Sequence, residues 1–278
     1  MSRSTAKILH ALVRGVTSLQ APRRRQASIA RLIEGLNEAG AVEVATARGP
    51  LKMLPLRGAH VAAALRWDQE EPETLAWIGE IRAGEVLSDV GAQIGFGALY
   101  AALGGVHVLA FEPKATSFAL LAEHIAINGL ADRVTPLCIA LYDTTRLSHL
   151  TLSTLGPGSW NNSLDGAADQ FGRRAEGVKQ GVPAMRGDDL ISMFKLEPPD
   201  HVKIDVDGVE GAVLAGLHET LPRVRTVLVE VEGENEADAP VLIEGPLTTA
   251  GFAEDMAFRG QVWAERLSST RSSAAGQL

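Results

Sequence analysis

Between residues 85 and 231, apolar runs alternate with segments of helical periodicity, and this alternation limits the folds open to the chain. The runs hold few polar positions, which is typical of strands buried on both faces of a parallel sheet. Strands joined by helices predict a doubly wound α/β fold. The expected strands are 86–90, 106–111, 134–141, 201–206 and 224–231, and the expected helices are 94–103, 115–128, 209–221 and 239–250.

The remaining segments complete a mostly parallel, seven-stranded sheet and add an extension before it. Residues 252–258 and 261–267 predict an antiparallel hairpin at one edge. Residues 154–180 lack periodicity and are rich in Gly, Ser, Asn and Asp, so we expect a loop insertion there. We therefore divide the chain into an N-terminal part (1–83), an α/β domain (84–267) and a flexible tail (268–278).

The N-terminal part begins with two helices expected within 5–39 and separated at Pro22. A short hairpin (42–46 with 51–56) and a helix at 73–81 follow. The first helix has one apolar face, and such a face requires a partner. We expect that partner to be the same domain or a second subunit in a homo-oligomer; a membrane surface is the alternative that the small number of basic residues disfavours.

Charge is divided unevenly along the chain. Residues 1–33 hold seven basic residues and no acidic one, whereas the remainder holds 19 basic against 34 acidic residues. A protein that binds duplex nucleic acid would spread basic residues over its binding face. The sequence therefore predicts that nucleic acid is not a partner.

Cysteine and histidine usage argues against disulfides and zinc. Cys138 is the only cysteine, so we expect a reduced, cytoplasmic setting. The seven histidines show no close pairing typical of zinc ligands. Glycines divide the uncharged stretch 90–111, and Arg14 interrupts the short apolar stretch 8–16. We therefore expect no transmembrane segment.

The motif VLSDVGAQIGFG at 86–97 places a glycine turn between a strand and a helix. Glycines allow the backbone to approach a ligand, and the helix N-terminus presents free N–H groups to it. The dinucleotide fingerprint would need Gly where Gln93 and Phe96 stand, and no Walker lysine follows. A nicotinamide enzyme and a P-loop enzyme are therefore disfavoured.

Two acidic residues end the first two expected strands, on either side of this turn. Glu112 lies 21 residues after Gly91 and is placed to bind both hydroxyls of a ribose. Asp89 is placed to bind a ligand amine. Together they predict a pocket for S-adenosylmethionine. Either acid alone is equally well explained as a turn cap or a solvated carboxylate, but the pair around the glycine turn favours the cofactor.

Five segments in order resemble the FkbM-type methyltransferases: EPETLAWI (71–78), DVGAQIGFGALYAA (89–102), AFEP (110–113), INGLADRV (127–134) and VKIDVDGVEGAVLAGL (202–217). The resemblance covers roughly residues 71–258. It implies a class I, Rossmann-like methyltransferase fold with S-adenosylmethionine as methyl donor. Transfer to a hydroxyl of a sugar, lipid or polyketide-type molecule is implied as well.

The resemblance also implies which residues bind the cofactor. They are Asp89, Gly91, Gly95 and Glu112, with Ala92, Gln93 and Pro113 beside them. The sequence departs from similar ones at Gln93 and His124, where Asn is usual. Gln tolerates a left-handed backbone less well than Asn.

The motif VKIDVDG (202–208) ends the fourth expected strand, which lies beside the first strand in such a sheet. We expect the catalytic residues there. An alcohol must lose its proton during methyl transfer, and Asp205 is our candidate general base. Lys203 shares its strand face and needs a buried carboxylate, Asp89 or Glu230. A structural ion pair is the slightly favoured explanation of Lys203 over a catalytic one.

A divalent metal is a second use for these acids. Asp205, Asp207, Glu210 and Glu230 together could hold Mg²⁺, although Asp207 and Glu210 are equally explained as acids at a helix start. We do not favour the metal.

Acceptor recognition is expected in the loop insertion. Trp160, Asn161 and Asn162 offer an aromatic ring beside amides, which suits a polyhydroxylated molecule; a surface turn explains them equally well. Asp143 follows the third strand and is a weaker candidate for binding the adenine amino group.

Three function classes remain from the sequence. The leading one is a small-molecule O-methyltransferase. A non-catalytic protein that binds S-adenosylmethionine and acts through its N-terminal helices is the alternative. A nucleic-acid methyltransferase is disfavoured by the acidic body and by the absence of an NPPY or DPPY sequence.

Overall fold

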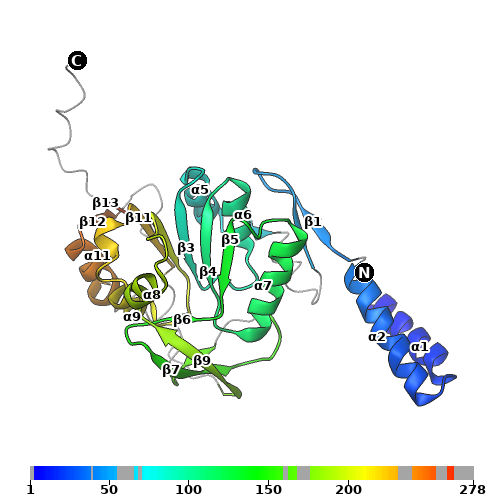
Figure 1. The fold of residues 1–278 in the computed structure, drawn as a ribbon. Coiled ribbons are helices and arrows are strands. Elements are labelled where there is room, and N and C mark those ends of the chain that lie inside the picture. Colours follow the sequence, from blue (N-terminus) through cyan, green and yellow to red (C-terminus); the bar gives the residue numbers. More distant parts are fainter. Residues whose placement is uncertain are drawn as a thin grey trace.

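The computed structural model describes residues 3–38, 40–54, 66–67, 71–158, 162–167, 176–230, 240–254 and 262–265. An α/β body makes up most of it, and a helical hairpin extends from this body at the N-terminal end (Figure 1). The predicted tail at 268–278 lies outside the described residues. None of the described helices is both long enough and apolar enough to cross a bilayer.

The large sheet has the strand order β12-β13-β11-β10-β3-β4-β5. The five strands from β11 to β5 are parallel, and β13 and β12 add the expected antiparallel pair at the other edge. The strands are β3 (Val86–Val90), β4 (His107–Phe111), β5 (Val134–Leu137), β10 (His201–Ile204), β11 (Thr226–Val229), β12 (Phe252–Glu254) and β13 (Val262–Glu265).

Helices cover both faces of this sheet and create two cores, as the doubly wound fold requires. One core contains α5 (Pro72–Glu80), α6 (Phe96–Leu103) and α7 (Ala115–Ile127). The other contains α8 (Gly187–Phe194), α9 (Glu210–Gly216) and α11 (Gly245–Thr249). A 3₁₀ turn, η1 (Leu221–Arg223), and a π-helix, η2 (Pro240–Glu244), complete this side.

A second, four-stranded sheet corrects two sequence predictions. Its order is β6-β9-β7-β8, with β6 (Ala140–Leu141), β7 (Arg146–Leu152), β8 (Ser163–Leu164) and β9 (Val178–Met185). The expected strand 134–141 is wrong as one element, because the chain turns after Leu137 and passes from the large sheet to the small one. The expected loop at 154–180 contains β8 and the start of β9.

The N-terminal segment begins with α1 (Arg3–Ser18) and α2 (Pro22–Glu38), as expected, and continues in the antiparallel pair β1 (Val42–Val44) and β2 (Leu51–Met53). Arg48, between these strands, donates to Ile78 O and Gly79 O at 2.9 and 3.0 Å, at the end of α5. Trp77 and Ile78 are buried in the first core. The described residues between 42 and 80 therefore contribute to the core of the α/β body, although they precede the predicted boundary at 84.

Candidate functional site

The glycine loop connects β3 to α6 at the carboxyl edge of the sheet. Gly91 and Gln93 both have positive φ angles, 88° and 52°. A Cβ atom on Gly91 would lie 1.8 Å from the backbone oxygen of Asp205, so only glycine fits there. Gly95, also at positive φ, precedes the first turn of α6. The turn has the tight geometry that its sequence predicted.

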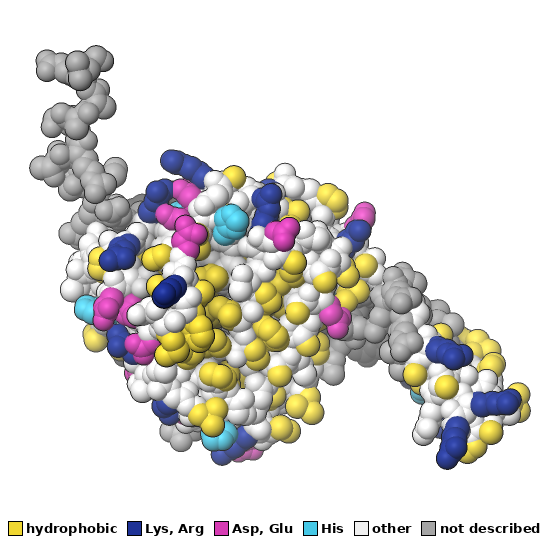
Figure 2. Space-filling view, in the orientation of Figure 1, with side chains coloured by type: hydrophobic (Ala, Val, Ile, Leu, Met, Phe, Trp, Pro, Cys, Tyr) yellow, Lys and Arg dark blue, Asp and Glu magenta, His cyan; other side chains and the backbone are white. Residues whose placement is uncertain are grey.

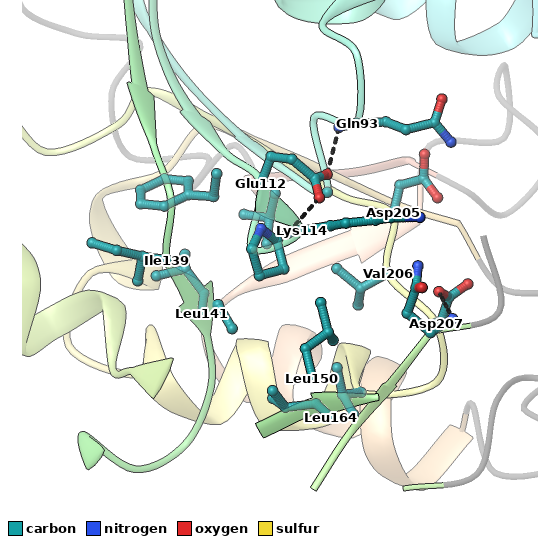
Figure 3. A pocket seen from close by; sticks show the side chains of 17 residues that line it. Gln93, Glu112, Lys114, Ile139, Leu141, Leu150, Leu164, Asp205, Val206 and Asp207 are labelled. Carbon is teal, nitrogen blue, oxygen red and sulfur yellow. Dashed lines mark hydrogen bonds between the residues drawn. The ribbon is translucent and has the colours of Figure 1, made fainter. Parts of the chain in front are cut away.

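Glu112 ties this loop to the end of β4. Its Oε2 accepts from Gln93 N at 2.9 Å and its Oε1 accepts from Lys114 N at 2.8 Å (Figure 3). Burial raises the pKa of Glu112 to about 8, and this effect is larger than that of the two hydrogen bonds, which lower the pKa. Each oxygen keeps a second lone pair for a ligand hydroxyl.

A pocket opens beside Glu112, with about 820 Å³ of empty space including its mouth. Figure 3 shows apolar side chains from the region of the small sheet on the side away from Gln93. The polar lining includes Gln93, Glu112, Lys114, Asn162, Asp205 and Asp207, and the apolar lining includes Ile139, Leu141, Leu150, Leu164, Val206 and Val209.

Lys203 and Asp205 form a contact at the end of β10. Lys203 Nζ lies 2.7 Å from Asp205 Oδ2 and 3.9 Å from Asp89 Oδ1. The lysine is buried, whereas the Asp205 side chain is 44% exposed and lines the pocket. Burial tends to raise the pKa of Asp205, but the Lys203 charge outweighs this and lowers it. Asp205 is therefore an anion at neutral pH.

Glu230, which follows β11, hydrogen-bonds to Asp205 and does not line the pocket. Its burial, followed by the charge of Asp205, raises the pKa of Glu230 to about 9. Two carboxyl groups can hydrogen-bond only when one is protonated, so Glu230 donates a proton to Asp205.

Asp89 lies behind the pocket and does not line it. Its side chain is buried at the first turn of α6, with Oδ2 beside Gly97 and Oδ1 without a hydrogen bond. Burial raises the pKa of Asp89, and the Lys203 charge opposes this effect. Asp89 is thus connected to the site through Lys203.

The other predicted binding residues differ in placement. Ala92 and Gly91 both donate backbone N–H groups to Phe111 O, and Pro113 lines the pocket. Asn162 also lines it, and its N–H donates to Asp207 Oδ2 at 2.9 Å. Trp160 and Asn161 lie outside the described residues. Asp143 is not brought to the pocket: its side chain is exposed and accepts from Thr144 Oγ1.

The four acids considered for Mg²⁺ do not converge. No group of three potential metal ligands occurs in the described part of the chain. Glu210 accepts from the N–H of Gly208, at the start of α9, and Asp207 accepts from Asn162. Lys203 occupies one side of Asp205. The donor set suits hydrogen bonding and gives the metal alternative no support.

Sequence reasoning missed residues that shape the site. Lys114 is almost fully buried and lines the pocket beside Glu112. Leu164 reaches the pocket from β8, inside the expected loop at 154–180, and Leu150 reaches it from β7, for which no strand was expected. The apolar alternation of Leu150 and Leu152 was the available signal for that strand.

His124 is a second missed contributor, because it supports the glycine loop from behind. Its Nδ1 donates to Ile94 O at 2.8 Å, and its Nε2 accepts from Leu54 N at 3.0 Å. The ring is fully buried, and this burial lowers the pKa of His124. A neutral imidazole therefore joins the segment after β2 to the loop.

Two solved structures are similar to this chain over part of its length. A methyltransferase FkbM from Methylobacillus flagellatus has a TM-score of 0.42 at 18% identity, covering 61% of this chain and 39% of that one. A precorrin-6y C5,15-methyltransferase from Geobacter metallireducens has a TM-score of 0.39 at 12% identity, covering 65% and 69%.

Sequence comparison finds closer similarity. The 31-O-demethyl-FK506 methyltransferase FkbM of Streptomyces tacrolimicus is 31% identical over 207 residues, 65% of this chain and 79% of that protein. The hexuronic acid methyltransferase AglP of Haloferax volcanii is 30% identical over 187 residues, 66% of this chain and 72% of that protein. The methyltransferase FkbM domain matches residues 89–255, which hold the glycine loop, Glu112 and Asp205. The chain therefore belongs to the FkbM methyltransferase family.

Proposed function

We propose that this methyltransferase uses S-adenosylmethionine to methylate a hydroxyl oxygen of a sugar, lipid or polyketide-type small molecule. The observation that carries the proposal is Glu112, whose two carboxylate oxygens are oriented by the glycine loop and face a pocket. A carboxylate held in this way at the end of the second parallel strand suits a ribose diol.

The pocket residues fit the other parts of the cofactor. Asp205 and Asp207 supply negative charge opposite a sulfonium and an amine. The side chains of Ile139, Leu141 and Leu150 give an apolar wall suited to a purine ring. S-Adenosylmethionine, when bound, supplies a methyl group on an already activated sulfonium.

Asp205 is the proposed proton acceptor. As an anion lining the pocket, it can accept a hydrogen bond from the acceptor hydroxyl and orient that oxygen. The hydroxyl proton becomes strongly acidic as its oxygen forms the new bond to carbon. A carboxylate of lowered pKa is therefore basic enough to take it.

Lys203 and Glu230 are the proposed positioning residues. Lys203 holds one oxygen of Asp205 at 2.7 Å, and the protonated Glu230 provides a second donor. These two hydrogen bonds fix the orientation of the Asp205 carboxylate. Asp89, behind Lys203, fixes the lysine in turn.

The acceptor class rests on the curated relatives and on the small sheet. Both relatives carry names of methyltransferases that act on hydroxyl-rich molecules, one on a demethylated FK506 and one on a hexuronic acid. Asn162, directly before β8 of this sheet, lines the pocket and is the proposed acceptor contact. Trp160 and Asn161, which lie outside the described residues, are proposed from the sequence alone.

Two measurements test the proposal in order. Isothermal titration with S-adenosylmethionine should give saturable binding at one site. A panel of hydroxylated sugars, lipids and macrolactones, each incubated with methyl-labelled cofactor, should then yield one labelled ether. Binding without transfer to any member would favour the non-catalytic alternative, and absence of binding would overturn the cofactor assignment.

A further inference from the structure

The helical hairpin, formed by α1 (Arg3–Ser18) and α2 (Pro22–Glu38), lies apart from the α/β body in Figure 1. The two helices pack on each other, and Thr17 is buried between them. The turn that joins them lies at the end far from the body (Figure 1). Among the described residues, nothing in the α/β body covers the apolar face of α1, although the same domain was one of its expected partners.

An apolar stripe follows one side of α1. Ile8, Leu12, Val16 and Leu19 are 61%, 58%, 61% and 89% exposed. The spacing of Ile8, Leu12 and Val16 places these three within about 80° around the axis of α1, and Leu19 follows directly after the last residue of the helix. Large aliphatic side chains in a row on a helix are normally buried against something.

The polar surface of the hairpin is basic. Seven basic residues lie within Arg3–Arg31, and the first acidic residue is Glu34. Figure 2 shows Lys and Arg side chains beside hydrophobic ones on the hairpin, whereas Asp and Glu side chains gather on the body. The exposed basic side chains are Lys7, Arg14, Arg23, Arg24 and Arg31.

Three consecutive arginines, Arg23 to Arg25, occupy the first turn of α2, which contains no acidic residue. Positive charge is unfavourable there, because the helix dipole is positive at its N-terminus. A bound anion would relieve this repulsion. The arginines follow directly after the turn that carries Leu19, the most exposed residue of the stripe.

Charge distinguishes the two candidate partners of the stripe, and the clustering of the basic residues on the hairpin reverses the expectation that their small number disfavours a membrane surface. A second copy seated on it would bring two basic hairpins together, and neither supplies acidic side chains before Glu34. An anionic lipid surface supplies both an apolar layer for the stripe and negative headgroups for the arginines. Because the hairpin extends away from the acidic body, that body need not approach the same surface.

We propose that the helical hairpin docks this methyltransferase on an anionic membrane surface, with the α1 stripe inserted at the headgroup boundary and Arg23 to Arg25 on the headgroups. The hairpin lies on the membrane and does not cross it. This proposal is independent of the cofactor and of the acceptor, because it uses no residue of the pocket.

Vesicle co-sedimentation of the full chain tests it. Vesicles of phosphatidylcholine with one quarter phosphatidylglycerol should bind the protein at least tenfold more tightly than phosphatidylcholine alone. This preference should weaken when NaCl is raised from 0.05 to 0.5 M. Two variants should each lose at least tenfold in affinity: the triple change Arg23→Gln, Arg24→Gln, Arg25→Gln, and the triple change Ile8→Ser, Leu12→Ser, Val16→Ser.

A matched control removes three exposed charges from the body, Arg82→Gln, Lys179→Gln and Arg223→Gln, and should bind vesicles at least as tightly as the wild type. Circular dichroism checks that the variants keep their helices. Equal binding to both vesicle types, or undiminished binding of the hairpin variants, would overturn the proposal. Light scattering tests the other partner. If the wild type does not bind vesicles and the Ile8, Leu12, Val16 variant has a lower native mass than the wild type, the stripe belongs to an interface with a second copy instead.

Discussion

Lys203 Nζ lies 2.7 Å from Asp205 Oδ2, so a buried cation contacts the half-exposed carboxylate at the pocket. The two residues stand two apart on one strand end, and their side chains share a face. The lysine keeps Asp205 ionised and restricts its rotation. One ion pair thus connects the interior of the sheet, where Asp89 is buried, to the chemistry at its edge.

Replacing Asp205 should separate catalysis from cofactor binding. Asp205→Asn keeps the shape of the side chain but cannot take a proton, so turnover should fall roughly 10²-fold or more. Titration should show S-adenosylmethionine affinity within about threefold of wild type. Asp189→Asn, a change at a half-buried aspartate outside the pocket, is the control. Full activity of Asp205→Asn would remove Asp205 as the base.

Glu112→Gln should weaken S-adenosylmethionine binding roughly tenfold or more, because the NH₂ group of Gln cannot accept from Gln93 N or Lys114 N, so the side chain loses the orientation proposed for the ribose. Glu210→Gln is the matched control, since Glu210 is also buried with its pKa raised to about 7 by that burial, but does not line the pocket. Equal affinity of wild type and Glu112→Gln in calorimetry would contradict the ribose assignment.

Asp143→Asn should leave cofactor affinity within about twofold of wild type. The Asp143 side chain is exposed, accepts from Thr144, and lies outside the pocket lining. A tenfold loss of affinity would instead support the sequence-based hypothesis that Asp143 binds adenine.

Glu230 should give the protein a pH-dependent stability. Its pKa is raised from 4.5 to about 9, so the folded state binds this proton more tightly than the unfolded state. Its contribution to stability is complete below pH 4.5 and is lost as pH rises through about 9.

Glu230→Gln keeps a hydrogen-bond donor that cannot ionise. Urea unfolding at pH 6 and pH 9 should therefore show a smaller decline in unfolding free energy for the variant than for wild type. Glu112 and Glu210 contribute to the decline in both proteins, so the difference between the two declines in unfolding free energy reports Glu230. Equal declines would argue against a proton shared by Glu230 and Asp205.

His124→Phe should lower the free energy of unfolding by about 2–4 kcal/mol, because it leaves Ile94 O and Leu54 N buried without partners. His124→Asn offers one donor and one acceptor and should lose less. Because burial lowers the pKa of His124, its stabilising effect is complete above pH 6.5 and is lost as pH falls below that value. Urea titrations at pH 7.5 and 5.5 compare the three proteins, and equal losses in both variants would contradict this role.

Hydrophobic periodicity was sufficient to predict the parallel strands and most covering helices, because each is long and buried on a defined face. Placing acids at strand ends also located Glu112 and Asp205 at one edge. The inward direction of Asp89 was not predictable, because it depends on how α6 packs over β3. Asp89 is a partner of Lys203, as predicted, but Asp205, directly after the same strand, lies nearer and was not among the predicted partners.

The small sheet escaped prediction for a different reason. Its strands β6 and β8 have two residues each, too few to show any period. Their pairing with β9 and β7 depends on contacts distant in sequence. The apolar wall of the pocket belongs to this sheet, so half of the site could not be derived from local pattern.

The contact between Gly91 and the backbone of Asp205 leaves no room for even a methyl group. A hydrogen bond from Asp205 N to Val90 O joins the same two segments. We therefore expect the glycine loop, proposed to hold the methyl donor, and Asp205, proposed to activate the acceptor, to move as one rigid unit. Substitutions at this contact between Gly91 and Asp205 are therefore poorly tolerated. Substitutions in the small sheet change the apolar side of the pocket and leave the contact unchanged, so we expect acceptor specificity to vary there.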